Sequence, residues 1–140
     1  MTRPLDFPPT VPNLLRRSAE RFGGRDYVIT PDRRLTFADA DARSRQLAKR
    51  LLASGVGKGT RVGMLFPQGA DFVIAFLGIT RIGAVAVPLS TFSRPPELRR
   101  GVRHVDVGLD GNLDDAVEII FDGVFGRDDF DIFGVGEVQS

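Results

Sequence analysis

A glycine-rich segment, Gly55-Val-Gly-Lys-Gly-Thr60, is the first place where the residue types could bind a phosphate. A Walker loop needs a glycine six positions before its lysine and Ser or Thr directly after it. Leu52 and Gly59 stand at those positions relative to Lys58. The order is also wrong, because a phosphate loop leads from a strand into a helix, whereas this segment follows a predicted helix and precedes a predicted strand. It therefore indicates a helix stop followed by a turn.

A second candidate site is acidic. Asp110, Asn112 and Asp114 have the spacing that opens a calcium-binding loop. The sixth position of such a loop is glycine and the twelfth is glutamate. This sequence has Asp115 and Phe121 there, so the pattern indicates ordinary acidic loop residues.

His104 is the only histidine, and the chain has no cysteine. A zinc site built from several histidines or thiolates, a disulfide and a cysteine nucleophile are therefore excluded. No Gly-x-Ser-x-Gly element offers a serine for which His104 could be the base. Its place among charges at a predicted helix end favours a solvated side chain or a partner of the helix dipole. No residue is predicted to be catalytic, to bind a cofactor or to ligate a metal.

Positive charge is concentrated in residues 1–105, which hold 18 Lys and Arg against 8 Asp and Glu, whereas residues 106–140 hold 1 and 10. A basic face could bind nucleic acid. These arginines, however, are spread over at least three predicted elements and lack interleaved exposed aromatic residues. We therefore expect a solvated face and no nucleic-acid partner, with a small basic binding module as the weaker alternative.

The beginning of the chain carries prolines and an acid where a secretory signal needs an apolar run. The most apolar stretch, residues 72–89, is interrupted by Arg81 and is too short to cross a bilayer. We therefore expect a cytoplasmic protein without a transmembrane segment.

Hydrophobic periodicity predicts the elements that would position any site. Thr10 can cap a first helix, and Thr36 with Asp39 forms a capping pattern for a long second helix whose Leu47, Leu51 and Leu52 face inward. The remaining expected helices and strands are helices at 69–83 and 95–103, a helical turn at 114–121, and strands at 27–30, 35–37, 61–66, 84–89 and 105–109. Strands alternating with helices predict an α/β fold, with crossover helices on a mostly parallel sheet.

The helix from Asp71 to Ile82 is apolar around nearly its whole circumference. Such a helix must be covered on all sides. Burying its six large apolar side chains is worth about 10–18 kcal/mol, at roughly 1.5–3 kcal/mol each. Because few partners for it can be found within 140 residues, we expect a further stretch of chain, or a catalytic partner chain, to cover it.

Two segments resemble core motifs of the adenylate-forming superfamily, which includes acyl-CoA synthetases, adenylation domains of peptide synthetases and luciferases. The first runs from Leu35-Thr-Phe-Ala-Asp-Ala through the long helix to Gly59-Thr-Arg-Val-Gly-Met-Leu. The second is Ile79-Thr-Arg-Ile-Gly-Ala-Val-Ala-Val-Pro-Leu-Ser, followed by Pro95-Pro-Glu-Leu. The resemblance covers residues 10–109 and is closest to the acyl-CoA synthetases, often enzymes of fatty acid metabolism.

This resemblance implies an AMP-forming ligase that uses ATP, Mg and CoA to convert a carboxylic acid, here a fatty acid, into its CoA thioester. The family's phosphate loop, ribose-binding aspartate and C-terminal lysine come later in the chain and have no counterpart here. The two motifs present are structural in the family, so no site residue is carried over. We expect a truncated chain that binds no cofactor and is inactive alone.

The resemblance also divides the chain. Residues 1–109 are expected to form an incomplete N-terminal subdomain, and residues 110–140 an acidic tail rich in Phe, Asp and Gly that is foreign or disordered. A non-catalytic subunit that docks on a separate catalytic chain is the alternative to a truncated enzyme.

Overall fold

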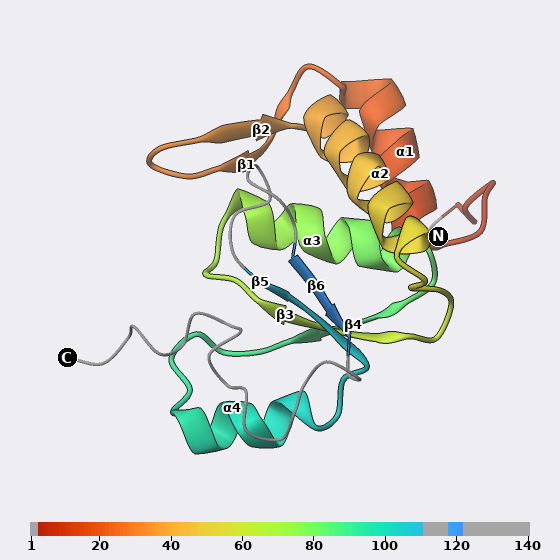
Figure 1. Ribbon diagram of the computed structural model, residues 1–140. Coiled ribbons are helices and arrows are strands. Elements are labelled where there is room, and N and C mark those ends of the chain that lie inside the picture. Colours follow the sequence, from red (N-terminus) through yellow and green to blue (C-terminus); the bar gives the residue numbers. More distant parts are fainter. Residues whose placement is uncertain (1–2, 111–117, 122–140) are drawn as a thin grey trace.

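The structure is a computed structural model that describes residues 3–110 and 118–121, and it contains helices packed on both faces of a mostly parallel sheet (Figure 1). The elements in chain order are α1 (Val11–Phe22), β1 (Asp26–Ile29), β2 (Arg34–Thr36), α2 (Phe37–Ala53), β3 (Arg61–Leu65), α3 (Ala70–Arg81), β4 (Val85–Pro88), α4 (Pro95–Val102), β5 (Val107–Asp110) and β6 (Glu118–Phe121). The α/β fold predicted from the sequence is confirmed.

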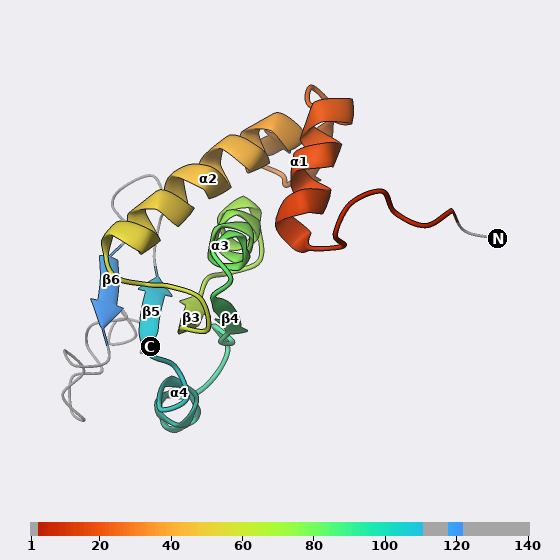
Figure 2. The same ribbon diagram turned by 90° about the vertical axis from the view of Figure 1, so that its right-hand side faces the viewer.

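The main sheet has the strand order β4-β3-β5-β6. β3 is parallel to both neighbours, with Val62 beside Ala86 on one side and beside Val107 on the other. β6 is antiparallel to β5. Figure 2 shows α1, α2 and α3 on one face of the sheet and α4 on the opposite face. This is the doubly wound arrangement, in which successive crossovers cover opposite faces.

Both predicted N-caps are present. The Thr10 hydroxyl accepts a hydrogen bond from the Asn13 N–H, and α1 begins at the next residue. At α2, the Thr36 hydroxyl accepts from the Asp39 N–H (3.1 Å) while the Asp39 carboxylate accepts from the Thr36 N–H (3.2 Å). This reciprocal capping box satisfies two donors that a helix start leaves open.

Helix α3 is covered within the chain. It packs against α1 and α2 on one side and against β3 and β4 on the other, and none of its residues is exposed. The expectation that few partners for this helix lie within 140 residues is wrong. The reason is that α2 and the sheet enclose it as a middle layer, which periodicity along one segment cannot reveal.

Two local expectations are also corrected. Leu52 was expected to face inward with Leu47 and Leu51, but 54% of it is exposed, because it lies on the α2 face turned away from α3. The helical turn expected at 114–121 is wrong for residues 118–121, which form strand β6. The rest of that segment, including Asp114 and Asp115, lies outside the described residues.

No helix in the described ranges is both long and apolar enough to cross a membrane.

The α2–α3 contact is close enough to require a glycine. A Cβ built on Gly78 would lie 2.7 Å from Cδ2, 2.9 Å from Cγ and 3.1 Å from Cβ of Leu47. Leu47 is itself 4% exposed. Relief of this clash would require the whole Leu47 side chain, or the helix that carries it, to move.

We predict that Gly78→Ala lowers the free energy of unfolding by about 1–2 kcal/mol. Overpacking a core costs roughly 1–3 kcal/mol, and the better helix propensity of alanine offsets up to about 1 kcal/mol of that. Urea unfolding followed by circular dichroism measures the change. Gly24→Ala is the control, because its Cβ meets nothing within 4 Å. Equal stability of the two variants would contradict the close approach.

Candidate functional site

The carboxyl edge of the parallel sheet is the place where this topology can form a binding crevice. The chain leaves β3 through α3 to β4, then returns past β3 through α4 to β5. The switch point therefore lies between β3 and β5. In open α/β sheets, ligands bind outside the carboxyl ends of the strands at this point.

The groups at that edge are mainly backbone donors and hydroxyls. Residues 66–69 connect β3 to α3, whose N-cap, Gly69, makes no side-chain capping bond. Ser90 and Thr91 follow β4 and are exposed. The first turn of α3 carries Asp71, which partly compensates the positive helix end. Such groups can orient a polar ligand by hydrogen bonds.

The β1–β2 hairpin reaches over this edge. Its turn brings Arg33 to Asp71, with Nη1 and Oδ1 2.8 Å apart and both side chains about one quarter exposed. Figure 1 shows the hairpin above the beginning of α3. The pair therefore fixes the hairpin to the start of the helix that follows the switch point. Sequence reasoning missed it, because 38 residues separate the partners.

The segment tested as a phosphate loop lies at the other edge of the sheet, where β3 begins. Gly55 and Gly59 have φ values of 88° and 83°, as turns that favour glycine require. The Gly57 N–H donates to the Thr60 hydroxyl, and the Gly59 N–H donates to the Gly83 carbonyl. The predicted helix stop and turn are confirmed.

The other sequence candidates are not brought together. His104 is exposed just after α4. Asp110 ends β5, while Asn112 and Asp114 of the tested calcium pattern lie outside the described residues. Among the residues that the structure describes, no group of three His, Cys, Asp or Glu side chains could hold a metal ion.

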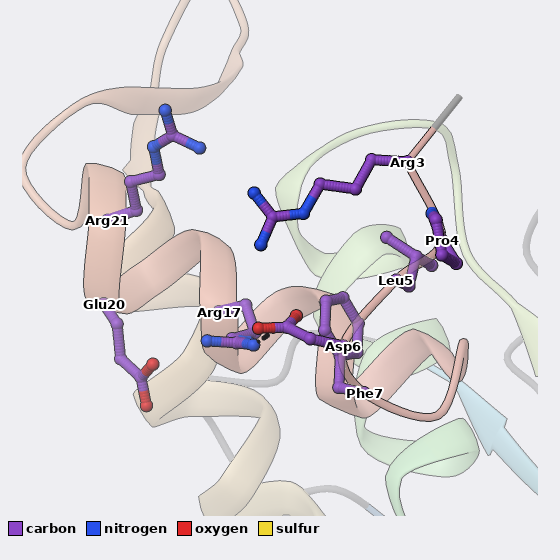
Figure 3. Close-up of a pocket in the computed structure, with 8 residues that line it drawn as sticks. All are labelled: Arg3, Pro4, Leu5, Asp6, Phe7, Arg17, Glu20 and Arg21. Carbon is purple, nitrogen blue, oxygen red and sulfur yellow. Dashed lines mark ion pairs between the residues drawn. The ribbon is translucent and has the colours of Figure 1, made fainter. Parts of the chain in front are cut away.

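A cavity of about 550 Å³ lies between the N-terminal segment and α1 (Figure 3). Asp6 and Arg17 form an ion pair across it, 2.5 Å between oxygen and nitrogen, and the Arg17 guanidinium lies 4.9 Å from the centre of the Phe7 ring. The hydrogen bond from Arg17 lowers the pKa of Asp6. These contacts attach the N-terminal segment to α1.

The most enclosed charges join α2 to α3. Arg81 Nη2 lies 2.5 Å from Asp41 Oδ1 and 3.2 Å from the Ser44 hydroxyl. The Asp41 and Arg81 side chains are only 13% and 16% exposed. Arg45 binds the other carboxylate oxygen of Asp41 at 2.5 Å. Only the Asp41–Arg45 spacing of four residues is visible in the sequence, so the pairing across helices had no local signal.

Another ion pair joins the amino ends of β3 and β5. The Asp106 carboxylate accepts from the backbone N–H of Arg61 at 2.8 Å and from its guanidinium at 2.9 Å. These hydrogen bonds, the guanidinium's first, lower the pKa of Asp106. Each lowered pKa in the described residues is thus caused by a hydrogen-bond partner that is part of the structure.

With this geometry established, comparison with known proteins identifies the class. Residues 15–109 match the family of AMP-binding enzymes. The chain therefore belongs to this family, and its fold corresponds to the N-terminal subdomain of adenylate-forming enzymes. The predicted resemblance is confirmed.

Similar proteins include a CoA ligase and a tyrocidine synthase. The long-chain-fatty-acid–CoA ligase FadD13 of Mycobacterium tuberculosis is 40% identical over 67 residues, which cover 48% of this chain and 13% of FadD13. Tyrocidine synthase 2 of Brevibacillus parabrevis is 34% identical over 85 residues, covering 60% of this chain and 2% of that protein.

Among solved structures, the anthranilate CoA ligase AuaEII in complex with anthranoyl-AMP aligns with a TM-score of 0.68 and 30% identity, over 75% of this chain and 20% of AuaEII. This chain thus spans no more than about one fifth of the length of these relatives.

We predict that Asp41→Ala destabilises the protein by about 2–4 kcal/mol. Removal of one partner of a buried ion pair costs roughly 3–5 kcal/mol, and the slight exposure of this pair reduces the expected loss. Arg45→Ala removes only the more exposed of the two ion pairs of Asp41 and should cost about 0.5 kcal/mol or less. Urea unfolding of both variants measures the difference. A loss as small for Asp41→Ala as for Arg45→Ala would contradict the assigned role.

We also predict that stability falls as the pH drops from about 5 to about 3. The pKa values of Asp6, Asp39 and Asp106 are lowered by their hydrogen-bond partners. A carboxyl with a lowered folded-state pKa stabilises the fold above its unfolded pKa, about 3.9 for Asp, and this contribution is lost as the pH falls through the folded pKa. Urea midpoints at several pH values test this. Asp106→Asn should make the dependence shallower, and an unchanged slope would count against it.

Proposed function

We propose that this chain is the N-terminal structural part of an AMP-forming ligase of the acyl-CoA synthetase type. The whole enzyme would join a carboxylate, a fatty acid in our proposal, to ATP, giving an acyl adenylate and pyrophosphate. The CoA thiol would then take the acyl group and release AMP. Mg would neutralise phosphate charge in the first step.

The observation that carries this proposal is the family match over residues 15–109, which includes α2, α3 and the parallel strands β3, β4 and β5. The likeness to FadD13 and to AuaEII supports a CoA ligase. The likeness to tyrocidine synthase 2 keeps a peptide-synthetase adenylation domain as the competing assignment.

We propose further that this chain has a scaffolding role and does not turn over substrate alone. Its two lysines, Lys49 on α2 and Lys58 in the following turn, are exposed and lie away from the carboxyl edge of the sheet. The described acids with altered acidity, such as Asp106, are held in structural pairs. The groups at the carboxyl edge are suited to orient a ligand that other residues would complete.

The division at residue 109 is also part of the proposal, with residues 1–109 as the family part and 110–140 as an acidic segment of other origin. A separate catalytic chain remains the second candidate, favoured by the small share of each relative that this chain spans. A cytoplasmic location would give access to ATP and CoA.

We predict no pyrophosphate release above background when the purified chain is given ATP, Mg, CoA and a panel of fatty and aromatic acids. FadD13 under the same conditions is the positive control. Turnover above background would contradict the scaffolding role. Recovery of activity only in fractions that contain a stoichiometric second chain would favour the subunit assignment over a truncated enzyme.

A further inference from the structure

The two edges of the main sheet differ in their capacity to accept another strand. On β4, the N–H groups of Val85 and Leu89 donate to the Thr60 and Met64 carbonyls, each at 2.8 Å. Because directions alternate along a strand, the nitrogen of Pro88 faces outward. Proline has no N–H to offer there, which is a common device for closing an edge. The β4 edge is therefore closed by its own sequence.

β5 has no such protection. It contains no proline, and Val107 and Leu109, which share one face of the sheet, are 3% and 0% exposed. The edge of β5 is therefore the one that no proline interrupts. There, β6 pairs antiparallel, with Gly108 beside Ile120 and Leu109 beside Ile119.

The strand that fills this position comes from outside the family part of the chain. The family match ends at Leu109, within β5, and β6 begins nine residues later. Figure 2 shows that α2 also continues across the sheet toward the β6 side. The last turn of α2 carries Leu52, which is more than half exposed. On the β5 side, the family part therefore leaves backbone groups that can pair with another strand, and it leaves exposed apolar surface.

We propose that β6 is a cap on the pairing edge of β5, and that two copies of this chain associate through their β5 edges when β6 is released. A two-fold axis makes identical strands antiparallel, and β6 shows that β5 accepts an antiparallel neighbour. The Asp106 N–H donates to the Arg61 carbonyl of β3, so Val107 and Leu109 direct their backbone groups toward the opposite edge. An axis at Leu109 places this residue opposite itself and Asp110 opposite Gly108 of the second copy. Like charges therefore do not meet directly.

Two neighbouring proline variants form a matched test. In an antiparallel pair, successive residues alternately face the partner and face away with their N–H and C=O groups. Only one of Ile119 and Ile120 therefore donates to β5. The proline variant at the isoleucine whose N–H donates to β5 should become a concentration-dependent dimer, measured by size exclusion with light scattering. The other variant and the wild-type chain should stay monomeric. Identical behaviour of both variants, or dimerisation of the wild type, would overturn the proposal.

Two further measurements keep the test decisive if a proline variant folds poorly. In the wild-type chain, amide hydrogen exchange should show alternating protection along 118–121 and protection along β5. An absence of protection in residues 118–121 would contradict the proposed cap. A synthetic peptide of residues 114–125, added in excess to the dimeric variant, should restore the monomer. Persistence of the dimer in its presence would show that the β5 edge is not the contact.

Discussion

The burial of α3 is the constraint on which the rest of the structure depends. A helix that is apolar on nearly all sides is stable only between two layers, here the parallel sheet and α2. The contact with α2 is closest where Gly78 meets Leu47. The Asp41–Arg81 pair then joins the same two helices with little exposure to solvent. The capping box at Thr36 fixes where α2 begins, and so aligns Leu47 and Asp41 with their partners on α3.

The position of α3 also fixes the topology of the sheet. With α3 on one face, the crossover from β3 leads to β4, and the next crossover places α4 on the opposite face. The strand order consequently reverses at β3, and the carboxyl edge between β3 and β5 becomes the natural crevice. The Arg33–Asp71 ion pair holds the β1–β2 hairpin at that edge. One packing requirement thus determines both where a ligand could bind and which element borders it.

Sequence reasoning succeeded where the determining signal is local. The caps Thr10 and Thr36 and the strand that begins at Arg61 each depend on residues within a few positions of one another. It failed where partners are distant. The Asp41–Arg81 pair spans 40 residues, and the cover of α3 comes from segments on both sides of it in the chain. Strand β6 was missed for the same reason, because an edge strand is selected by the free partner beside it rather than by its own periodicity.

The distribution of charged groups supports the scaffolding role that we propose for this part of the fold. Catalytic groups combine perturbed acidity with an open position in a cleft. The lowered pKa values here belong to carboxyls that already have structural partners: Asp6 with Arg17, Asp39 with Thr36, and Asp106 with Arg61. Each partnership secures a junction between elements, so the carboxylate cannot also serve a substrate without loosening that junction. In the scaffolding role that we propose, chemistry at the carboxyl edge would come from groups outside the described residues.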